Sequence, residues 1–260
     1  MAKSDKILIM KFGGAAVKSA KNFSKIADLI LRRNADYKKI AIVISAMGNM
    51  TDELISLAKE VNSDPPRREY DMLVSVGERV SIALLAMALA AKGRGAVSYT
   101  GSQTGIITTS DHSEATIIDV RPYRLLESLS QGKFVIVAGF QGMSENREIT
   151  TLGRGGSDTT AVALGVALGA DRVEFYKDVT GIFDQDPKQF TDSTLCSRLS
   201  FDEALKVIHA SGGKVLHPRA IRLAQKNGLP LQIRSFHHAD VEGSLVFSDK
   251  QTSNKELIYE

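Results

Sequence analysis

The sequence has a single cysteine, Cys196, and no tryptophan in 260 residues. One cysteine cannot form an internal disulfide, so a disulfide-stabilised secreted fold is excluded and a reducing cytoplasm is the expected location. The apolar runs are short and interrupted, and the N-terminal residues show no apolar stretch followed by a small-residue cleavage site. We therefore expect a cytoplasmic protein with no membrane span and no export signal.

Neither sign of charge dominates, because 33 lysine and arginine residues stand against 30 aspartate and glutamate residues, which leaves a net charge of +3. The charges are scattered without a basic block, which argues against a nucleic-acid partner. The 5 histidines lack metal-ligand spacing, so we expect no metal site formed by the protein itself. The patterns G-x-x-x-x-G-K-[ST], G-x-G-x-x-G and G-x-S-x-G are also absent, which argues against P-loop, Rossmann and acyl-enzyme proteins.

What the sequence does contain is an alternation of buried-strand patterns and helical patterns, in a chain long enough for one large α/β domain or two lobes that share a cleft. This alternation predicts a mostly parallel sheet with helices on both faces. The paired prolines of residues 62–68 predict a mobile loop, and the polar residues after Val246 predict either a frayed end or a stub that leads to a further segment. The expected strands are Lys6–Lys11, Lys39–Ser45, Gly95–Thr100, Lys133–Ala138, Arg172–Tyr176 and Leu231–Arg234, and the expected helices are Asn22–Arg33, Asp52–Val61, Glu78–Ala91, Pro122–Gln131, Asp158–Leu168, Phe201–His209 and Pro218–Asn227.

Glycine and hydroxyl clusters follow several of these strands, at the edge where open α/β sheets bind ligands. Lys11 closes the first strand, and Gly13 and Gly14 then allow the backbone amides to approach a ligand such as phosphate. A strand followed by two glycines is also an ordinary turn. Thr51 after the second strand either caps the next helix or contacts a ligand. Glu78 is predicted in the first turn of a helix, where a carboxylate can also serve only to interact with the helix dipole.

The stretch T-T-L-G-R-G-G-S-D-T-T-A, residues 150–161, concentrates glycine amides, Arg154 and Asp158 at one predicted helix N-terminus. Such a site suits anions. Asp158 as a simple helix cap would leave Arg154 and the excess of glycine unexplained. Two further clusters follow, one between Lys177 and Lys188 and one that presents Lys214 after two glycines.

Taken in order, K-F-G-G, V-I-S-A-M-G-N-M-T-D, V-S-V-G-E-R-V-S, A-G-F-Q-G, T-T-L-G-R-G-G-S-D-T-T-A, K-D-V-T-G-I-F with D-P-K, and G-G-K-V-L-H-P resemble the aspartate kinases of the amino acid kinase family, from about residue 6 to 246. The resemblance implies a three-layer αβα sandwich with a mainly parallel eight-stranded sheet. It implies one domain over residues 1–260, with an acceptor-binding part at about 1–170, a nucleotide-binding part at 171–246, a tail at 247–260 and no ACT regulatory domain. It also implies a homodimer.

The resemblance further implies ATP- and Mg²⁺-dependent phosphorylation of the side-chain carboxylate of L-aspartate to 4-phospho-L-aspartate, the first step toward lysine, threonine and methionine. The catalytic residues it implies are Lys11, Asp158 and Lys214, and the aspartate-binding residues are Ser45, Thr51, Glu78, Phe140, Arg154 and Ser157. The ATP-binding residues it implies are Lys11, Gly13, Gly14, Lys177, Asp178, Gly181, Asp186, Lys188 and Lys214. The family more often has threonine at position 177 and arginine at position 188.

Elementary chemistry agrees with these roles. Glu78 can pair with an α-ammonium, and Arg154 can hold an α-carboxylate through two parallel hydrogen bonds. The side-chain carboxylate of aspartate is already ionised at neutral pH, so the transfer needs alignment and charge neutralisation but no general base.

Two other functions stay open from the sequence. Ala15 and Ala16 replace the Thr-Ser that usually follows K-F-G-G, so the same fold acting on a different amino or carboxylic acid is one alternative. A non-catalytic nucleotide-binding or storage protein is the other. The joint presence of Lys11, Asp158, Lys177, Asp178 and Lys214 argues against it, because simple binding does not need both phosphate lysines and their acidic partner.

Overall fold

The computed structural model describes residues 4–185, 189–190, 192–210, 215–238, 240–248 and 257–259. In this part of the chain the strands form two sheets. The larger sheet has the order β10-β12-β11-β9-β1-β2-β6-β3. Its strands are β1 (Ser4–Phe12), β2 (Tyr37–Ile44), β3 (Ala96–Tyr99), β6 (Phe134–Ala138), β9 (Arg172–Lys177), β10 (Arg198–Ser200), β11 (Leu231–Ser235) and β12 (Ser244–Phe247).

Neighbouring strands of the large sheet run parallel, except that β12 is antiparallel to β11. The chain leaves β1 toward β2 on one side and later places β9 on the other side, so the strand order reverses at β1. Such a switch point leaves a crevice at the carboxyl ends of the strands. The fold thus predicts a ligand site beyond Phe12.

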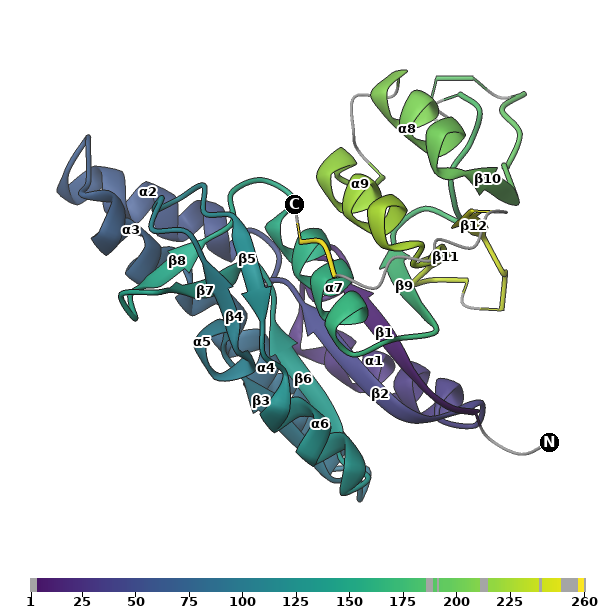
Figure 1. Cartoon of the computed structure of the whole chain (residues 1–260), viewed down its shortest axis with the longest axis horizontal. Helices are drawn as coiled ribbons and strands as arrows, with labels where there is room; N and C mark the ends of the chain where they lie inside the picture. Colours follow the sequence, from purple (N-terminus) through teal and green to yellow (C-terminus); the bar gives the residue numbers. More distant parts are fainter. Residues whose placement is uncertain are drawn as a thin grey trace.

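Helices cover both faces of this sheet, which confirms the expected three-layer αβα sandwich. Buried side chains of α1 and α4 form one hydrophobic core with one face, and those of α6, α7, α8 and α9 form a second core with the other face. Figure 1 shows α8, α9 and β9 to β12 at one end of the molecule and α2 and α3 at the other. The helices are α1 (Ala20–Arg33), α2 (Met50–Val61), α3 (Arg67–Val74), α4 (Val76–Ala90), α5 (Gly101–Thr104), α6 (Tyr123–Ser130), α7 (Gly156–Ala167), α8 (Phe201–Ala210) and α9 (Pro218–Asn227).

The alternation of side chains along β1 decides which core each residue enters. Ile7 and Ile9 belong to the α7 side, whereas Leu8 and Met10 belong to the α1 side. Successive side chains of a strand point to opposite faces, so Lys11 lies on the α7 side with Ile7 and Ile9. Lys11, which lies just before the first glycine-rich loop, is therefore directed toward the start of α7.

The second sheet has the order β5-β4-β7-β8 and was not predicted. Its strands are β4 (Ile106–Thr108), β5 (Ile117–Val120), β7 (Gln141–Ser144) and β8 (Ile149–Thr151). Each is three or four residues long, which is too short to show the alternation of apolar and polar residues by which a strand is recognised.

Two predictions about loops were wrong. Residues 62–68 are not wholly a loop, because α3 begins at Arg67 with Pro66 as its N-cap. A frayed end is wrong for residues 257–259, because the side-chain amide of Asn227 donates to the carbonyl of Ile258 at 2.6 Å and accepts from its amide at 3.1 Å.

One helical stretch, Arg67–Ala90, is long and apolar enough by length and composition to cross a membrane, with a mean hydropathy of 1.8. Core helices of soluble proteins pass the same test. Here Ile82, Leu85 and Leu89 of α4 are buried in the core beside α1, which accounts for the apolar composition. The expected absence of a membrane span stays a prediction.

Candidate functional site

A cleft of about 1010 Å³ opens where β1 and β2 end and α7 begins. This volume is at the upper end of the range of about 300–1,000 Å³ that ligand sites usually have. The cleft brings together most of the residues predicted to bind an acceptor and a phosphoryl group. Those that line it are Lys11, Gly14, Ser45, Thr51, Glu78, Phe140, Arg154, Ser157 and Asp158.

Two lysines from neighbouring strands meet Asp158 in the first turn of α7. The Nζ of Lys11 lies 2.6 Å from Oδ1 of Asp158, and the Nζ of Lys177 lies 3.1 Å from Oδ2. β1 and β9 pair with Lys11 opposite Phe175, and Phe175 faces the α7 core. Lys177, two residues further along β9, therefore lies on the same face as Lys11.

Burial makes this charge cluster unusual. Burial opposes ionisation of Asp158, but the two ammonium groups outweigh it and hold its pKa well below the usual range. For Lys11, burial and the nearby Lys177 prevail over attraction by Asp158 and lower its pKa to about 8. At neutral pH the cluster therefore holds two ammonium groups against one carboxylate, and it can accept a further anion.

Glu78 lies in the first turn of α4, which packs on the opposite face of the large sheet from α7. Oε1 accepts a hydrogen bond from the amide of Ala46 at 3.2 Å, whereas Oε2 is buried without a hydrogen-bond partner among the described residues. Burial raises the pKa of Glu78 to about 7. Gly77 makes this position possible, because a Cβ there would come within 2.7 Å of the Cβ of Ala46.

The loop from β8 into α7 carries Arg154 between two glycines in the left-handed region. Gly153 has φ of +68° and Gly155 has φ of +72°, which residues with a side chain rarely adopt. A Cβ on Gly155 would also lie 2.2 Å from Cγ of His217. This tight turn leaves Arg154 exposed at the cleft and sets the N-terminus of α7 behind it, so both can face an anion.

Comparison with known proteins places this arrangement in a family. The sequence pattern of the "Amino acid kinase family" matches residues 6–235. The chain belongs to the amino acid kinase family. The aspartokinase of Bacillus sp. (strain MGA3) is 43% identical over 252 residues, which cover 97% of this chain and 61% of that protein. This chain thus spans about three fifths of the length of that relative.

Solved structures of aspartate kinases share the fold. The enzyme from Synechocystis superposes with a TM-score of 0.86 at 42% identity, over 97% of this chain and 41% of that one. Aspartokinase III of E. coli, solved in complex with aspartate and ADP, gives a TM-score of 0.84 at 26% identity, over 95% of this chain and 66% of that one. These similarities confirm the resemblance to aspartate kinases that the sequence motifs indicated.

Phe140 lies against the start of α7, where Ser157 is in the first turn. Phe140 is a non-glycine residue with φ of +71°, and its amide donates to the hydroxyl of Thr160 at 3.1 Å. A Cβ on Gly156 would lie 2.9 Å from the ring of Phe140, and one on Gly139 would lie 2.7 Å from Ser157. The glycines next to Phe140 and Ser157 thus allow two loops to close tightly over the helix N-terminus.

The first glycine loop lies against the charge cluster. A Cβ on Gly13 would lie 3.7 Å from Nζ of Lys11, so the Gly13 backbone runs beside the ammonium group. Ala16 is 3% exposed and belongs to the α1 core, whereas Ala15 is exposed. The side chain at position 16 is therefore directed into the core.

Of the structural alternatives to ligand binding that the sequence offered, the two that concern helix caps are wrong. Thr51 does not cap α2, because the helix begins at Met50 with Asn49 as its N-cap. Asp158 does not cap α7, because Gly155 is its N-cap. Both side chains line the cleft instead.

Of the residues predicted to bind the nucleotide, Asp178 and Gly181 do not line the cleft. Asp178 is exposed after β9, and Gly181 is buried where a Cβ would lie 2.5 Å from the hydroxyl of Ser244. That close approach gives Gly181 a packing role of its own. Asp186, Lys188 and Lys214 lie outside the described residues.

Sequence reasoning missed several residues of the cleft. Ser113 and Glu114 come from a segment without a recognisable motif, and Lys59, Arg67 and Tyr70 come from α2 and α3. A pair of arginines after two prolines is typical of exposed loops, so Arg67 gave no usable signal. Among the described residues, no group of three or more His, Cys, Asp or Glu side chains could hold a metal ion.

Proposed function

We propose that this protein transfers the γ-phosphoryl group of ATP to the side-chain carboxylate of L-aspartate and forms 4-phospho-L-aspartate. The observation that carries the proposal is one cleft with the Lys11–Asp158–Lys177 cluster, Glu78 and Arg154 around it. An acidic amino acid offers a matching set of charges, one ammonium and two carboxylates. The similar E. coli aspartokinase III was solved with aspartate and ADP.

Glu78 and Arg154 orient the amino acid in this proposal. The unpartnered Oε2 of Glu78 accepts from the α-ammonium, which relieves the cost of a buried carboxylate. Arg154 grips the α-carboxylate with two parallel hydrogen bonds. Thr51 and Ser45 supply hydroxyl groups, and Phe140 and Ser157 line the cleft beside them.

The charge cluster then serves the transfer step. The ammonium groups of Lys11 and Lys177, together with Lys214, neutralise phosphate oxygens as the γ-phosphoryl moves in line to the acceptor. Amides of Gly13, Gly14 and the α7 N-terminus add hydrogen-bond donors. No residue has to remove a proton, since the attacking carboxylate is already ionised.

Mg²⁺ fits this scheme as part of the nucleotide. Both oxygens of Asp158 are engaged by lysine ammonium groups, and Mg²⁺ commonly keeps several waters and binds substrate phosphates with one or two carboxylates. We propose that Mg²⁺ is held chiefly by the ATP phosphates, where it supplies charge neutralisation.

The nucleotide itself is proposed to lie over residues 171–246, where Lys177, Asp178 and Gly181 are the described residues predicted to bind it. The acceptor part would be residues 1–170. One sheet runs through both parts, since β9 pairs with β1. A rigid sheet can hold the two substrates in register for direct transfer.

We propose that formation of 4-phospho-L-aspartate serves lysine, threonine and methionine biosynthesis in the cytoplasm. We also propose a homodimer, and the apolar groove of about 610 Å³ between α2 and α4 supports it. Leu57 in that groove is 51% exposed, and sedimentation velocity of the purified protein measures the assembly directly.

Acceptor-dependent ADP release tests the proposed function. The purified protein is incubated with Mg-ATP and, in turn, with L-aspartate, L-glutamate, homoserine and N-acetylglutamate. We expect turnover with L-aspartate alone. Turnover with another acid instead would establish a different acceptor on the same fold, and ATP binding without any acceptor-dependent release would indicate a non-catalytic protein.

A further inference from the structure

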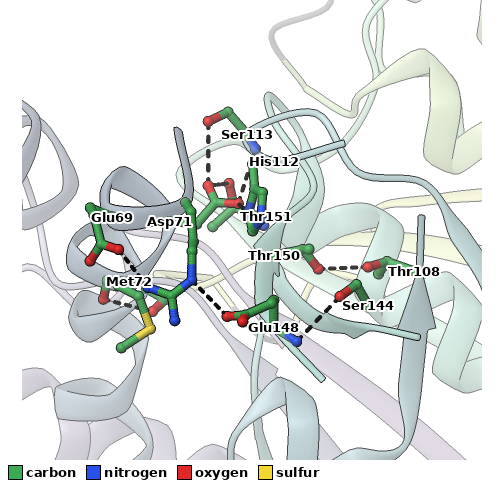
Figure 2. Close-up of polar contacts among 12 residues, drawn as sticks. Glu69, Asp71, Met72, Thr108, His112, Ser113, Ser144, Glu148, Thr150 and Thr151 are labelled. Atoms are coloured by element: carbon green, nitrogen blue, oxygen red, sulfur yellow. Dashed lines mark hydrogen bonds and ion pairs between the residues drawn. The ribbon is translucent and has the colours of Figure 1, made fainter. Parts of the chain in front are cut away.

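Asp71 in α3 is a fully buried carboxylate with no place in the reaction described above. Its relative exposure is 0%. Thr151 donates to it through its hydroxyl at 2.6 Å and its amide at 3.1 Å, and Ser113 donates through its amide at 3.0 Å. Nδ1 of His112 lies 2.9 Å away. Figure 2 shows these groups converging on Asp71 from two segments far apart in the sequence.

Those two segments form one wall of the cleft, which we call the acceptor wall and define as residues 112–115 and 151–154. Ser113, Thr151 and Arg154 all line the cleft. Ser113 has φ of +74°, and such a left-handed non-glycine residue persists only where its surroundings hold it. Asp71 supplies that hold through the Ser113 amide and, at 3.4 Å, its hydroxyl.

The strained Ser113 in turn touches the loop that carries Arg154. A Cβ on Gly153 would lie 3.2 Å from the carbonyl oxygen of Ser113. A chain of contacts thus runs from Asp71 through Ser113 to Gly153, the residue before Arg154. Because Thr151 is bound directly as well, Asp71 fixes both segments of the wall.

The other side of the acceptor wall has a separate support. Arg219 in α9 donates to the carbonyl of Leu152 at 3.2 Å and to that of Ala115 at 3.4 Å. Loss of Asp71 would therefore leave the wall attached to α9 but free to shift on the α3 side. The expected consequence is misplacement of Arg154 in a folded protein.

We propose that Asp71 is a positioning residue that holds the acceptor wall, and through it Arg154, in the geometry that binds the α-carboxylate of the acceptor. This inference rests on the proposed function for the identity of the acceptor. It assigns Asp71 no contact with either substrate. Substitution of Asp71 is therefore expected to weaken binding of the acceptor and to leave binding of ATP unchanged.

Three variants separate this role from simple stabilisation. Asp71→Asn keeps the size and one acceptor oxygen, and Asp71→Leu removes every hydrogen bond. Glu148→Gln is the matched control, because it breaks an exposed ion pair with Arg68 that joins the same two elements, α3 and the β7–β8 hairpin. Exposed pairs of this kind contribute little to stability.

Kinetics give the first readout. We expect Asp71→Leu to raise KM for L-aspartate roughly tenfold or more through misplacement of Arg154, Asp71→Asn to raise it less, and all variants to keep KM for ATP within about twofold of wild type. If Asp71→Leu does not fold, Asp71→Asn carries the test. An unchanged KM for L-aspartate, or an equal rise for both substrates, would overturn the inference.

Hydrogen exchange gives a readout that needs no activity. Peptides that contain Ser113 and Thr151 are expected to exchange faster in Asp71→Asn than in Glu148→Gln, while peptides of β1 and β2 exchange equally. Unchanged exchange would overturn the inference. If the wild-type protein does not phosphorylate L-aspartate, the proposed function fails on its own, and the exchange comparison still decides the role of Asp71.

Discussion

Replacement of Glu78 by glutamine is expected to make the protein more stable and less able to bind its acceptor. Glu78 is 3% exposed, and its Oε2 has no hydrogen-bond partner among the described residues. A glutamine of the same shape keeps the acceptor for the Ala46 amide and removes the buried charge. The cost of that charge is visible in the pKa of Glu78, which burial raises from 4.5 to about 7.

The size of the effect follows from this change in pKa. Below pH 4.5 the side chain is protonated in both the folded and the unfolded chain, so it does not affect the comparison. As the pH rises, the unfolded chain ionises first and gains free energy that the folded chain gains only above pH 7. The wild type therefore loses about 3 kcal/mol relative to Glu78→Gln between pH 4.5 and 7, since a tenfold change in proton affinity is worth about 1.4 kcal/mol.

The assay is urea unfolding of both proteins at pH 4.5, 6 and 8, together with KM for L-aspartate. The stability advantage of Glu78→Gln should grow from near zero to about 3 kcal/mol across this series. Its KM at pH 8 should be about 10 to 100 times that of the wild type, because a hydrogen bond to a charged group is worth about 1.5–3 kcal/mol. Equal stability at pH 8, or an unchanged KM, would refute the reasoning.

Three further predictions concern the phosphoryl side of the cleft. The kcat/KM of the wild type should fall above about pH 8, because burial and Lys177 lower the pKa of Lys11 to about 8 despite the attraction of Asp158. Lys177→Met removes one of these two causes, so it should move the fall in kcat/KM to higher pH. Asp158→Asn should lower kcat by roughly 10²–10³ and reduce the free energy of unfolding by about 3–5 kcal/mol, because it leaves buried ammonium groups unpaired; a kcat within tenfold of wild type would contradict this. Ala16→Ser should leave kcat within about threefold and cost about 1 kcal/mol in urea unfolding, since the hydroxyl enters the core; a tenfold gain in kcat would show that a hydroxyl at this position serves the reaction.

Strong periodic patterns made most of the large sheet predictable. The apolar runs that became β1, β2 and β6 are long and β-branched, and the helix that begins at Val76 buries residues at helical spacing. The small sheet was missed because its strands are only three or four residues long, too short to show an alternating pattern. Helix α3 was missed because the prolines before Arg67 were interpreted as the centre of a loop, whereas Pro66 is the helix N-cap.

The candidate site was only partly predictable for a different reason. Glycines and charges near one helix N-terminus pointed to Arg154 and Asp158. The position of Lys177 against Asp158 depends on the pairing of β1 with β9, which lie about 160 residues apart in the chain and whose pairing no local pattern reveals. Asp71 gave no signal at all, because a carboxylate in an amphipathic helix is usually solvent-exposed and this one is buried only through contacts with residues 112–113 and 151.

In the proposed reaction this cleft makes an acyl phosphate from L-aspartate. Incubation of the purified protein with Mg-ATP, L-aspartate and hydroxylamine tests it most directly, because hydroxylamine traps an acyl phosphate as a hydroxamate. We expect aspartyl hydroxamate in an amount that matches the ADP released and that drops at least a hundredfold in Asp158→Asn. Release of ADP without hydroxamate, or a hydroxamate formed only from another acid, would contradict it.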